Sequence, residues 1–418
     1  MKPLRFCHVT TFYPPYNFGG DGIGVQRLCR ALVRAGHEVT LVHDADAYRA
    51  LRRAPPPPAE PEPEGLEVVR LESGAPRLAS MLTQQTGRPV VHRRQLAALL
   101  GEREWDVINF HNVSLIGGPG ILGLGRALKL YMAHEHWLVC PSHVLWRHDR
   151  EPCTGRECLR CVLHFHRPPQ AWRYTAAIQR AGRHVDRFIA MSEFSRAKHR
   201  EFGFPFEMEV LPYFLPDPEP GAEPPVRAAG GPRFHPRPYF LYVGRLERIK
   251  GLDDVIPLFR GFEEADLLVA GEGEHGARLR ELAAGSPRVR FLGRLSDADL
   301  AQAYRGAEAL IVPSAGFETF GIILIEAFRA GTPVIARRIG PFPEIVEQAG
   351  SGELFSTPDE LAGAMRRLLR DPGLRERHAR RGYQAWLERW TESAVLPRYL
   401  DIVARAAERK AAAELRKL

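Results

Sequence analysis

The chain has no long apolar run. Its longest uncharged and nearly apolar stretch, 113–125, contains 13 residues and is interrupted by glycine and proline, whereas a helix needs about 20 apolar residues to cross a bilayer. The first residues, MKPLRFCHVTTFYPP, lack the sustained apolar core and the small-residue cleavage site of a secretory signal. We therefore expect a cytoplasmic protein whose cysteines stay reduced.

A strong excess of charge of either sign is also missing. The 418 residues include 58 Lys and Arg against 50 Asp and Glu, a formal net charge of +8, and 44% of them are hydrophobic. This composition excludes wholesale disorder and a bundle of membrane helices, and the length suffices for two domains with cores of their own. The modest basic excess would suit a nucleic acid, an anionic membrane or a small phosphorylated ligand.

Segments with strand and helix patterns alternate along the chain. An apolar run at 4–9, a helical pattern from Gly22 that ends at Gly36, and a strand at 39–42 form a βαβ unit. Strands that alternate with helices in this way predict parallel sheets. Further strands are expected at 67–71, 107–110, 129–133, 187–191 and 209–211, and then at 239–243, 267–270, 289–292, 309–312 and 333–336.

A proline-rich segment at 216–238 separates the two series of strands and is expected to be a linker or surface crossing. The predicted fold is α/β, with two Rossmann-like doubly wound domains facing a cleft. The N-terminal domain is expected at 1–215 and the C-terminal domain at 216–389, while a helix from about residue 390 to 418 packs back on the first domain. A second proline-rich tract, 55–63, is expected to be an extended surface loop.

Ligands of doubly wound sheets bind at the carboxyl ends of the strands. The loop at 17–24, NFGGDGIG, joins the first strand to the first helix, and its glycines would let backbone N–H groups approach an anion at the helix start. The lysine-bearing P-loop pattern is absent, so an ordinary tight turn is the alternative. Arg245 and Lys250 follow the strand at 239–243, where two cations would suit a diphosphate. A solvated basic turn is the alternative there.

Two carboxylates bracket the start of a later helix. The segment 313–333, PSAGFETFGIILIEAFRAGTP, combines a strand end, a glycine-bearing loop and a helix that begins near Phe320 and Gly321. Glu318 precedes this start, and Glu326 lies eight residues later, about two helical turns. One carboxylate could bind sugar hydroxyls and the other a ribose diol. A helix-terminal charge and an exposed helical residue are the alternative.

The arrangement Glu318-x7-Glu326 within PSxxxETFGxxxxEAxxxGTPV resembles the signature of retaining glycosyltransferases of family 4, which have the B-type fold (GT-B) of two Rossmann-like domains. The resemblance extends to the N-terminal glycine loop, to VGRLERIKG, to VAGEGE, to VRFLGRLSDADLAQAY and to GPFPEIVE, in consistent order along nearly the whole chain. It implies retention of the anomeric configuration, no required catalytic metal and no obvious covalent nucleophile.

The resemblance also implies roles for residues of the second domain. Arg245 and Lys250 would bind the donor diphosphate and stabilise the leaving nucleotide, Glu326 would hold the ribose hydroxyls, and Glu318 would contact the donor sugar. Backbone N–H groups around Phe320 and Gly321 would bind sugar hydroxyls or phosphate at the helix start.

In the first domain, the resemblance implies that Gly19 and Gly20 approach the diphosphate. His134, in YMAHEHW, would reach the donor sugar and the reacting centre, and His111, in NFHN, is a candidate on the acceptor side. A satisfied structural role is the alternative for either histidine.

Two DxD strings could hold a metal in another glycosyltransferase architecture. Asp44-Ala-Asp46 follows the second strand, and Asp297-Ala-Asp299 begins a helix. We expect an exposed loop for the first string and an N-terminal helix turn for the second.

Four of the six cysteines are bunched. Cys140, Cys153, Cys158 and Cys161 lie in an irregular stretch rich in His, Arg and Pro, and the last two form a CxxC pair. Four thiolates could bind a structural zinc that orders a loop beside the acceptor site. Reduced thiols without metal and an iron–sulfur cluster are the alternatives.

The expected function is transfer of a sugar from a nucleotide-sugar donor to a hydroxyl acceptor, which could be a glycan, a lipid-linked acceptor or a small molecule, as in polysaccharide biosynthesis. The alternatives are a sugar-phosphate synthase, a nucleotide-sugar epimerase, or a basic nucleotide-sugar- or membrane-binding protein without transfer activity. Nucleic acid is not an expected partner. Peripheral contact with the inner face of an anionic membrane would use basic residues of the first domain, with ordinary solvated faces as the alternative: Arg88, Arg93, Arg94, Arg126 and Lys129.

Overall fold

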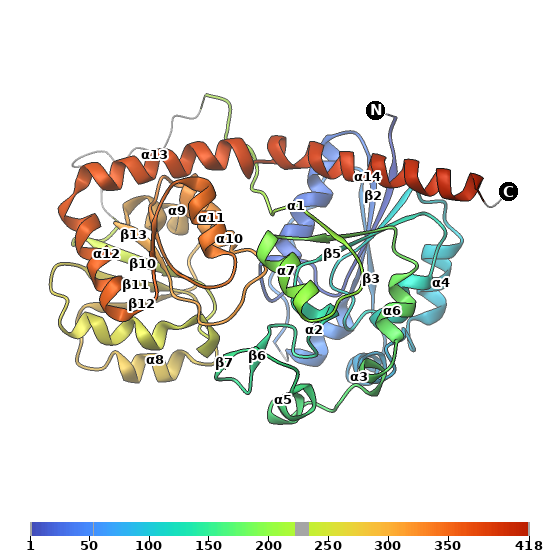
Figure 1. Ribbon diagram of the computed structural model, residues 1–418, viewed down its shortest axis with the longest axis horizontal. Helices are drawn as coiled ribbons and strands as arrows, with labels where there is room; N and C mark the ends of the chain where they lie inside the picture. The colour runs from blue at the N-terminus through green and yellow to red at the C-terminus, as the bar shows by residue number, and fades with distance from the viewer. Residues whose placement is uncertain (1, 53, 222–233, 417–418) are drawn as a thin grey trace. The chain divides into compact units, whose positions relative to one another are not determined.

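The computed structural model describes residues 2–52, 54–221 and 234–416 (Figure 1). The chain divides into two compact units. The first unit comprises Met1–Val144, Gly155–Phe214 and Val395–Leu418, and the second comprises Leu145–Thr154 and Leu215–Ala394. Most of the expected linker, 222–233, lies outside the described residues.

A seven-stranded parallel sheet forms the centre of the first unit, in the order β3-β2-β1-β4-β5-β8-β9. β1 lies between β2 and β4, so the strand order reverses beside it, which is where doubly wound sheets bind ligands. The strands are β1 (Arg5–Thr10), β2 (Glu38–Asp44), β3 (Leu66–Leu71), β4 (Val107–Phe110), β5 (Leu128–Ala133), β8 (Arg187–Ala190) and β9 (Met208–Val210).

Helices connect these strands and bury their apolar sides. The helices and 3-10 turns are α1 (Gly20–Arg34), α2 (Ala45–Leu51), α3 (Pro76–Thr86), α4 (Arg93–Gly101), η1 (Gly118–Gly123), η2 (His136–Leu138), α5 (Cys158–His164), η3 (Ala171–Tyr174), α6 (Ala177–Gly182) and α7 (Glu193–Glu201). α1 ends where Gly36 adopts a φ of +86°, a conformation that glycine takes without strain. The core lies between the sheet and this helical layer.

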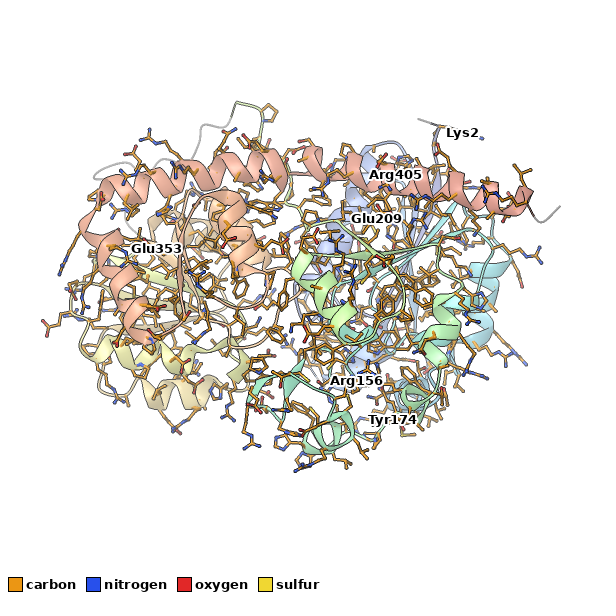
Figure 2. All side chains as sticks on the ribbon, viewed as in Figure 1. Lys2, Arg156, Tyr174, Glu209, Glu353 and Arg405 are labelled. Carbon is orange, nitrogen blue, oxygen red and sulfur yellow. The ribbon has the colours of Figure 1, made fainter. Side chains whose placement is uncertain are left out.

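The C-terminal helix α14 (Glu392–Leu415) contributes its second part to the first unit. The Tyr399 hydroxyl accepts a 3.0 Å hydrogen bond from the amide of Asn109 in β4. Arg405 forms a 2.6 Å ion pair with Glu209 in β9, and both residues are labelled in Figure 2. These contacts attach 395–416 to the first unit, in which the sequence analysis places the last helix.

The second unit has a six-stranded parallel sheet in the order β12-β11-β10-β13-β14-β15. Its first strand, β10, again lies beside the reversal of strand order, between β11 and β13. The strands are β10 (Tyr239–Val243), β11 (Asp266–Ala270), β12 (Val289–Gly293), β13 (Ala309–Val312), β14 (Val334–Arg337) and β15 (Glu353–Phe355). The helices and turns are η4 (Arg248–Lys250), η5 (Leu252–Asp254), η6 (Ile256–Arg260), α8 (Gly276–Leu282), α9 (Asp297–Gly306), α10 (Ile322–Arg329), α11 (Phe342–Ala349), α12 (Pro358–Arg370) and α13 (Pro372–Arg389).

The predicted pair of Rossmann-like α/β domains is confirmed, but one segment departs from the expected boundaries. Residues Leu145–Thr154 group with the second unit, although they fall within the expected N-terminal domain, and form a hairpin of β6 (Trp146–Arg147) and β7 (Glu151–Pro152). The Trp146 ring lies 3.3 Å from the position that a Cβ on Gly316 would take. This packing against a distant glycine has no signature in the local sequence.

The first DxD string is buried, so the expectation of an exposed loop is wrong. Asp44 caps α2 by accepting a 3.1 Å hydrogen bond from the backbone N–H of Ala47. Asp46 accepts a 2.6 Å bond from the hydroxyl of Ser73, and the same oxygen lies 3.0 Å from Nε2 of His92. The second string begins α9 after Ser296, as expected.

No helix in the described part of the chain is both long and apolar enough to cross a membrane.

Candidate functional site

In the second unit, the loops that follow β10 and β13 are joined directly. The backbone N–H of Ala315 donates a 2.8 Å hydrogen bond to the carbonyl of Ile249. Gly251 adopts a φ of +73°, and a Cβ at this position would lie 2.1 Å from the carbonyl oxygen of Pro313. Only glycine therefore lets the VGRLERIKG loop approach the end of β13 so closely.

This approach places Lys250 against Glu318. Lys250 Nζ lies 2.7 Å from Oε1 of Glu318, and the hydroxyl of Ser314 donates to the same oxygen at 2.7 Å. Burial opposes ionisation of Glu318, but Lys250, Ser314 and the charge of Arg245 outweigh it and lower the pKa of this carboxyl. Glu318 is thus a carboxylate at neutral pH, and its side chain remains 22% exposed.

Arg245 begins the same loop with its backbone fixed and its side chain in solvent. The hydroxyl of Tyr242 donates a 2.9 Å hydrogen bond to the Arg245 carbonyl. Arg245 Nη1 forms a 2.6 Å ion pair with Glu247, and the arginine side chain is 55% exposed. Because exposed pairs of this kind are worth at most about 1 kcal/mol, Arg245 can turn toward an anion at little cost.

Glu326 lies in the second turn of α10. Gly321 precedes the helix with a φ of +119°, and a Cβ there would lie 2.9 Å from the ring of Phe342. Phe320 is buried. Glu326 Oε2 accepts a 3.3 Å hydrogen bond from the hydroxyl of Tyr304, whose pKa is raised by burial and by the Glu326 charge. The helix start and the Glu326 carboxylate therefore have fixed positions in the unit.

In the first unit, His111 and His134 follow the carboxyl ends of β4 and β5 and belong to a continuous hydrogen-bonded chain. His111 Nδ1 lies 2.8 Å from His134 Nε2, and His111 Nε2 lies 2.9 Å from Nδ1 of His8 in β1. The hydroxyl of Tyr213 bonds Nδ1 of His134. We call Tyr213, His134, His111 and His8 the histidine chain.

The histidine chain is neutral at physiological pH. Burial lowers the pKa of His8 and of His134 to about 3, and burial together with the neighbouring imidazoles lowers the pKa of His111 well below its ordinary value. Both ring nitrogens of His134, and both of His111, have partners within the first unit. These partners fit the satisfied structural role that the sequence leaves open for the two histidines, and their roles in the site stay predictions.

The glycine loop begins α1 and touches the histidine chain. Gly19 is the N-cap of α1, and Gly20 is its first residue. A Cβ on Gly24 would lie 2.3 Å from the ring of Tyr213, so this glycine lets Tyr213 reach His134. A Cβ on Gly19 would meet its nearest atom only at 3.6 Å. Packing therefore explains Gly24, whereas the chain's own packing does not require glycine at position 19.

The four bunched cysteines are divided between the two units. Cys140, Cys158 and Cys161 belong to the first unit and Cys153 to the second, and none of them is in a disulfide. Cys158 and Cys161 lie within the short helix α5. Among described residues, the one group of three potential ligands within 4.8 Å is Asp44, Asp46 and His92. The zinc site stays a prediction.

Sequence reasoning missed Ser314, Tyr304, Tyr213 and His8, which hold the predicted residues. Ser314 could have been found, because it follows a strand four residues before Glu318. The other three act across 22 to 103 residues of sequence. No local pattern marks them.

Models of two protein families match the chain. The family described as "Glycosyl transferase 4-like domain" matches residues 19–213, and the family described as "Glycosyl transferases group 1" matches residues 229–385. Phosphatidyl-myo-inositol mannosyltransferase of Mycobacterium leprae is 37% identical over 153 residues, which are 35% of this chain and 41% of that protein. The chain thus spans about two fifths of that relative. Glycogen synthase of Mycobacterium tuberculosis is 27% identical over 404 residues, 91% of this chain and 90% of that protein.

Solved structures share the fold over nearly the whole chain. Sucrose-phosphate synthase from Thermosynechococcus elongatus superposes with a TM-score of 0.70 at 19% identity and covers 96% of this chain and 98% of its own. HepE of Anabaena in complex with UDP-glucose gives a TM-score of 0.63 at 17% identity and covers 98% of this chain and all of its own, 100%. The predicted GT-B type of fold is thereby confirmed.

Proposed function

We propose that this chain, whose two domains match the models of two families of glycosyl transferases, transfers a glycosyl group from a nucleotide-sugar donor to a hydroxyl acceptor with retention of anomeric configuration, as a member of family 4. The observation that carries the proposal is the cluster of Lys250, Glu318 and Ser314 where β10 and β13 end. A cation and a carboxylate held side by side can bind a diphosphate and the hydroxyls of its sugar.

The donor lies on the second unit in this proposal. Lys250 and Arg245 bind the diphosphate, the Glu318 carboxylate accepts hydrogen bonds from the sugar, and Glu326 accepts from the ribose diol. Backbone N–H groups at the start of α10, next to Phe320 and Gly321, add a partial positive charge. The complex of HepE with UDP-glucose supports a nucleotide-sugar donor for the fold.

Transfer breaks the bond between the anomeric carbon and a diphosphate oxygen, forms a bond to the acceptor oxygen and passes the acceptor proton to the departing diphosphate. Negative charge then develops on the diphosphate, where Lys250 and Arg245 are already placed to stabilise it. Gly19 and Gly20 provide the start of α1 as a second source of N–H groups. His134 acts on the donor sugar only if a sugar hydroxyl replaces Tyr213 or His111 as its partner.

Three further elements belong to the proposal. The reaction requires no catalytic metal, and a structural zinc would bring together the thiolates of Cys140, Cys153, Cys158 and Cys161. The protein works in the cytoplasm, with peripheral contact at the inner face of the membrane. The acceptor binds mainly to the first domain, near His111.

Thermal stabilisation by UDP-, GDP- and ADP-sugars tests the donor assignment, because a ligand that binds the folded state raises its unfolding temperature. We expect one nucleotide class to stabilise the wild type, and both Lys250→Ala and Glu326→Ala to lose that effect. Lys198→Ala is the matched control, since Lys198 pairs with Glu201 on α7. Stabilisation that persists in both site variants would overturn the assignment. Measuring the release of free or transferred sugar distinguishes turnover from donor binding.

A further inference from the structure

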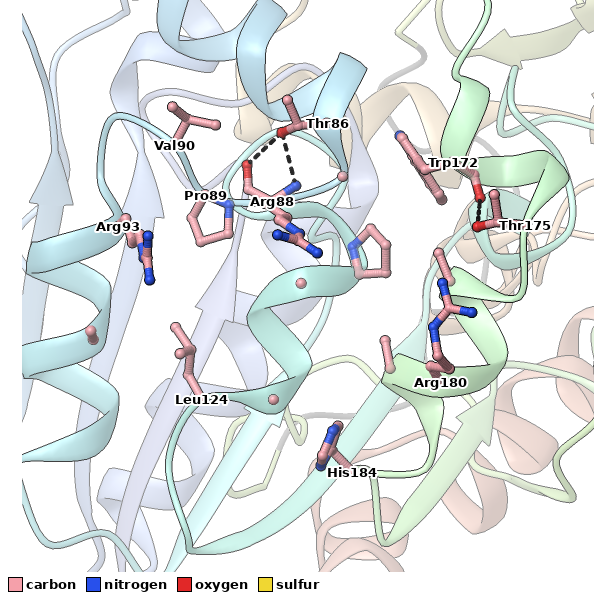
Figure 3. A pocket seen from close by; sticks show the side chains of 17 residues that line it. Thr86, Arg88, Pro89, Val90, Arg93, Leu124, Trp172, Thr175, Arg180 and His184 are labelled. Carbon is pink, nitrogen blue, oxygen red and sulfur yellow. Dashed lines mark hydrogen bonds between the residues drawn. The ribbon is translucent and has the colours of Figure 1, made fainter.

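The first unit contains a cavity of about 780 Å³ away from the histidine chain. The loop between α3 and α4, the turns η1 and η3, and α6 form its walls (Figure 3). Leu124 and His184, which line it, come shortly before β5 and β8. His111 and His134 follow the opposite, carboxyl ends of strands, so the cavity is separate from the candidate site of this unit.

The charge of the lining has one sign. Arg88 and Arg93 come from one stretch of the chain and Arg180 and His184 from another, and no aspartate or glutamate is among the described residues that line the cavity. Figure 3 shows Arg88 between Arg93 and Arg180, His184 farther from Arg88, and the hydrogen bonds that join the Thr86 hydroxyl to the backbone of Arg88. Basic groups that line one cavity without a carboxylate among them fit an anionic ligand.

The remaining lining is largely apolar. It includes Trp172, Leu124, Pro89 and Pro119, and Val90 is 42% exposed beside them. An inorganic anion alone would leave the apolar surface in water. A ligand that carries both an anion and an apolar body would use the whole cavity.

The floor is rigid because glycine backbones touch there. The N–H of Gly120 donates a 2.9 Å bond to the carbonyl of Gly87, and a Cβ on Gly118 would lie 2.7 Å from the Gly87 carbonyl carbon. Trp172 packs over Gly87, and its ring N–H donates a 2.9 Å bond to the carbonyl of Gln84. The walls are therefore formed before any ligand binds, which reduces the ordering that binding requires.

We propose that this cavity binds an amphipathic phosphate: the phosphate lies between Arg88, Arg93 and Arg180, and the apolar chain lies against Trp172 and Leu124. The ligand could be a soluble phosphorylated molecule or the headgroup region of a membrane lipid, and both offer the same chemistry. This site does not depend on the proposed transfer reaction.

Binding of monomeric dodecyl phosphate, measured by calorimetry, tests the proposal. We expect Arg88→Gln/Arg180→Gln to weaken binding by at least about tenfold, since two charge-assisted contacts are lost. The exposed Arg160 and Arg183 do not line the cavity, so Arg160→Gln/Arg183→Gln should change binding by less than about twofold. The proposed site would be overturned if the two double variants lost the same affinity for dodecyl phosphate, or if Arg88→Gln/Arg180→Gln lost none.

Two comparison ligands test the amphipathic character. Inorganic phosphate and neutral dodecyl maltoside should each bind at least about tenfold more weakly than dodecyl phosphate, and equal binding of either one would contradict the proposal. Sedimentation with phosphatidylglycerol or phosphatidylcholine vesicles distinguishes a membrane lipid from a soluble phosphorylated ligand. Arginine-dependent binding to the anionic vesicles alone indicates a lipid, and binding of the monomer alone indicates a soluble ligand. Nucleotide-sugar stabilisation of the same variants should remain at the wild-type level, which keeps this test independent of the donor site.

Discussion

Lys250 and Glu318 form a 2.7 Å ion pair between two loops that follow neighbouring strands, β10 and β13. The two residues are 68 positions apart in the chain. Their meeting follows from the topology, because adjacent parallel strands bring their carboxyl ends to the same edge of a sheet. In the proposed reaction, the same pair holds the diphosphate and the sugar of one donor molecule.

Lys250→Met should reduce turnover by about 10²–10³-fold, because it removes a cation from the place where charge develops. Glu318→Gln should retain the hydrogen bond from Ser314 and leave Lys250 without its anionic partner, so we expect donor binding at least as tight as in the wild type but slower transfer. Steady-state kinetics with the donor found by thermal stabilisation checks both variants. Turnover of Lys250→Met within threefold of the wild type would contradict the role of Lys250.

The candidate residues of the two units differ in how far the sequence could predict them. Lys250 and Glu318 were predictable because each follows an apolar strand at a recognisable distance, and strands such as Tyr239–Val243 and Ala309–Val312 have the expected bounds. Tyr213 was not predictable, because it reaches His134 across 79 residues and only through the space that Gly24 leaves.

The burial of an acidic side chain could not be predicted where its hydrogen-bond partners are distant in the sequence. Asp46 reads as a loop residue, yet it is fully buried because Ser73 and His92 satisfy its carboxylate. An acidic residue after a strand is exposed by default, and only long-range hydrogen bonds reverse that expectation.

The histidine chain should make the protein sensitive to acid. The folded state keeps the pKa of His8 and His134 at about 3, below the value of about 6.5 in an unfolded chain. Their contribution to the free energy of unfolding is complete above pH 6.5 and is lost as the pH falls toward 3. His8→Gln keeps a hydrogen-bonding group beside His111 and removes one of these titrations, so urea unfolding between pH 7 and 4 should show a smaller acid loss.

The exposed His166 provides the control for that measurement. His166→Gln should follow the wild-type pH profile, because this side chain is not buried. An acid loss in His8→Gln equal to that of the wild type would show that the histidine chain does not set the acid sensitivity.

Asp44 should affect the pH dependence of stability in the opposite direction, favouring the folded state at acid pH. Burial raises the pKa of its carboxyl to about 7, with Asp46 adding to the rise and the Ala47 N–H and His92 opposing it. The folded state thus favours the protonated form, and this contribution is present below about pH 4 and is lost as the pH rises through 7. Asp44→Asn should therefore gain stability relative to the wild type between pH 4 and 8, on the order of 2–4 kcal/mol. A difference in unfolding free energy that does not change with pH would contradict the raised pKa.

The cysteine prediction requires metal analysis. If the four thiolates bind zinc, freshly purified protein should contain about one equivalent, and Cys158→Ser/Cys161→Ser should lose it. Cys7 and Cys29 are buried in the first unit outside the bunched set, so Cys29→Ser should retain the metal. Zinc and iron both below about a tenth of an equivalent would exclude the metal site, and the thiols would then be reduced side chains in the arrangement described above.

Gly251 offers a test of how the donor site is built. A Cβ at this position would lie 2.1 Å from the Pro313 carbonyl oxygen, in a backbone with φ +73°. Gly285 has a similar φ of +80°, but a Cβ there would meet nothing within 4 Å. Gly285→Ala therefore measures the cost of the left-handed conformation alone, about 1–2 kcal/mol, whereas Gly251→Ala adds a clash that separates Lys250 from Glu318. We expect Gly251→Ala to lose nucleotide-sugar stabilisation and Gly285→Ala to keep it. Equal donor binding by the two variants would show that the close approach at Pro313 does not position Lys250.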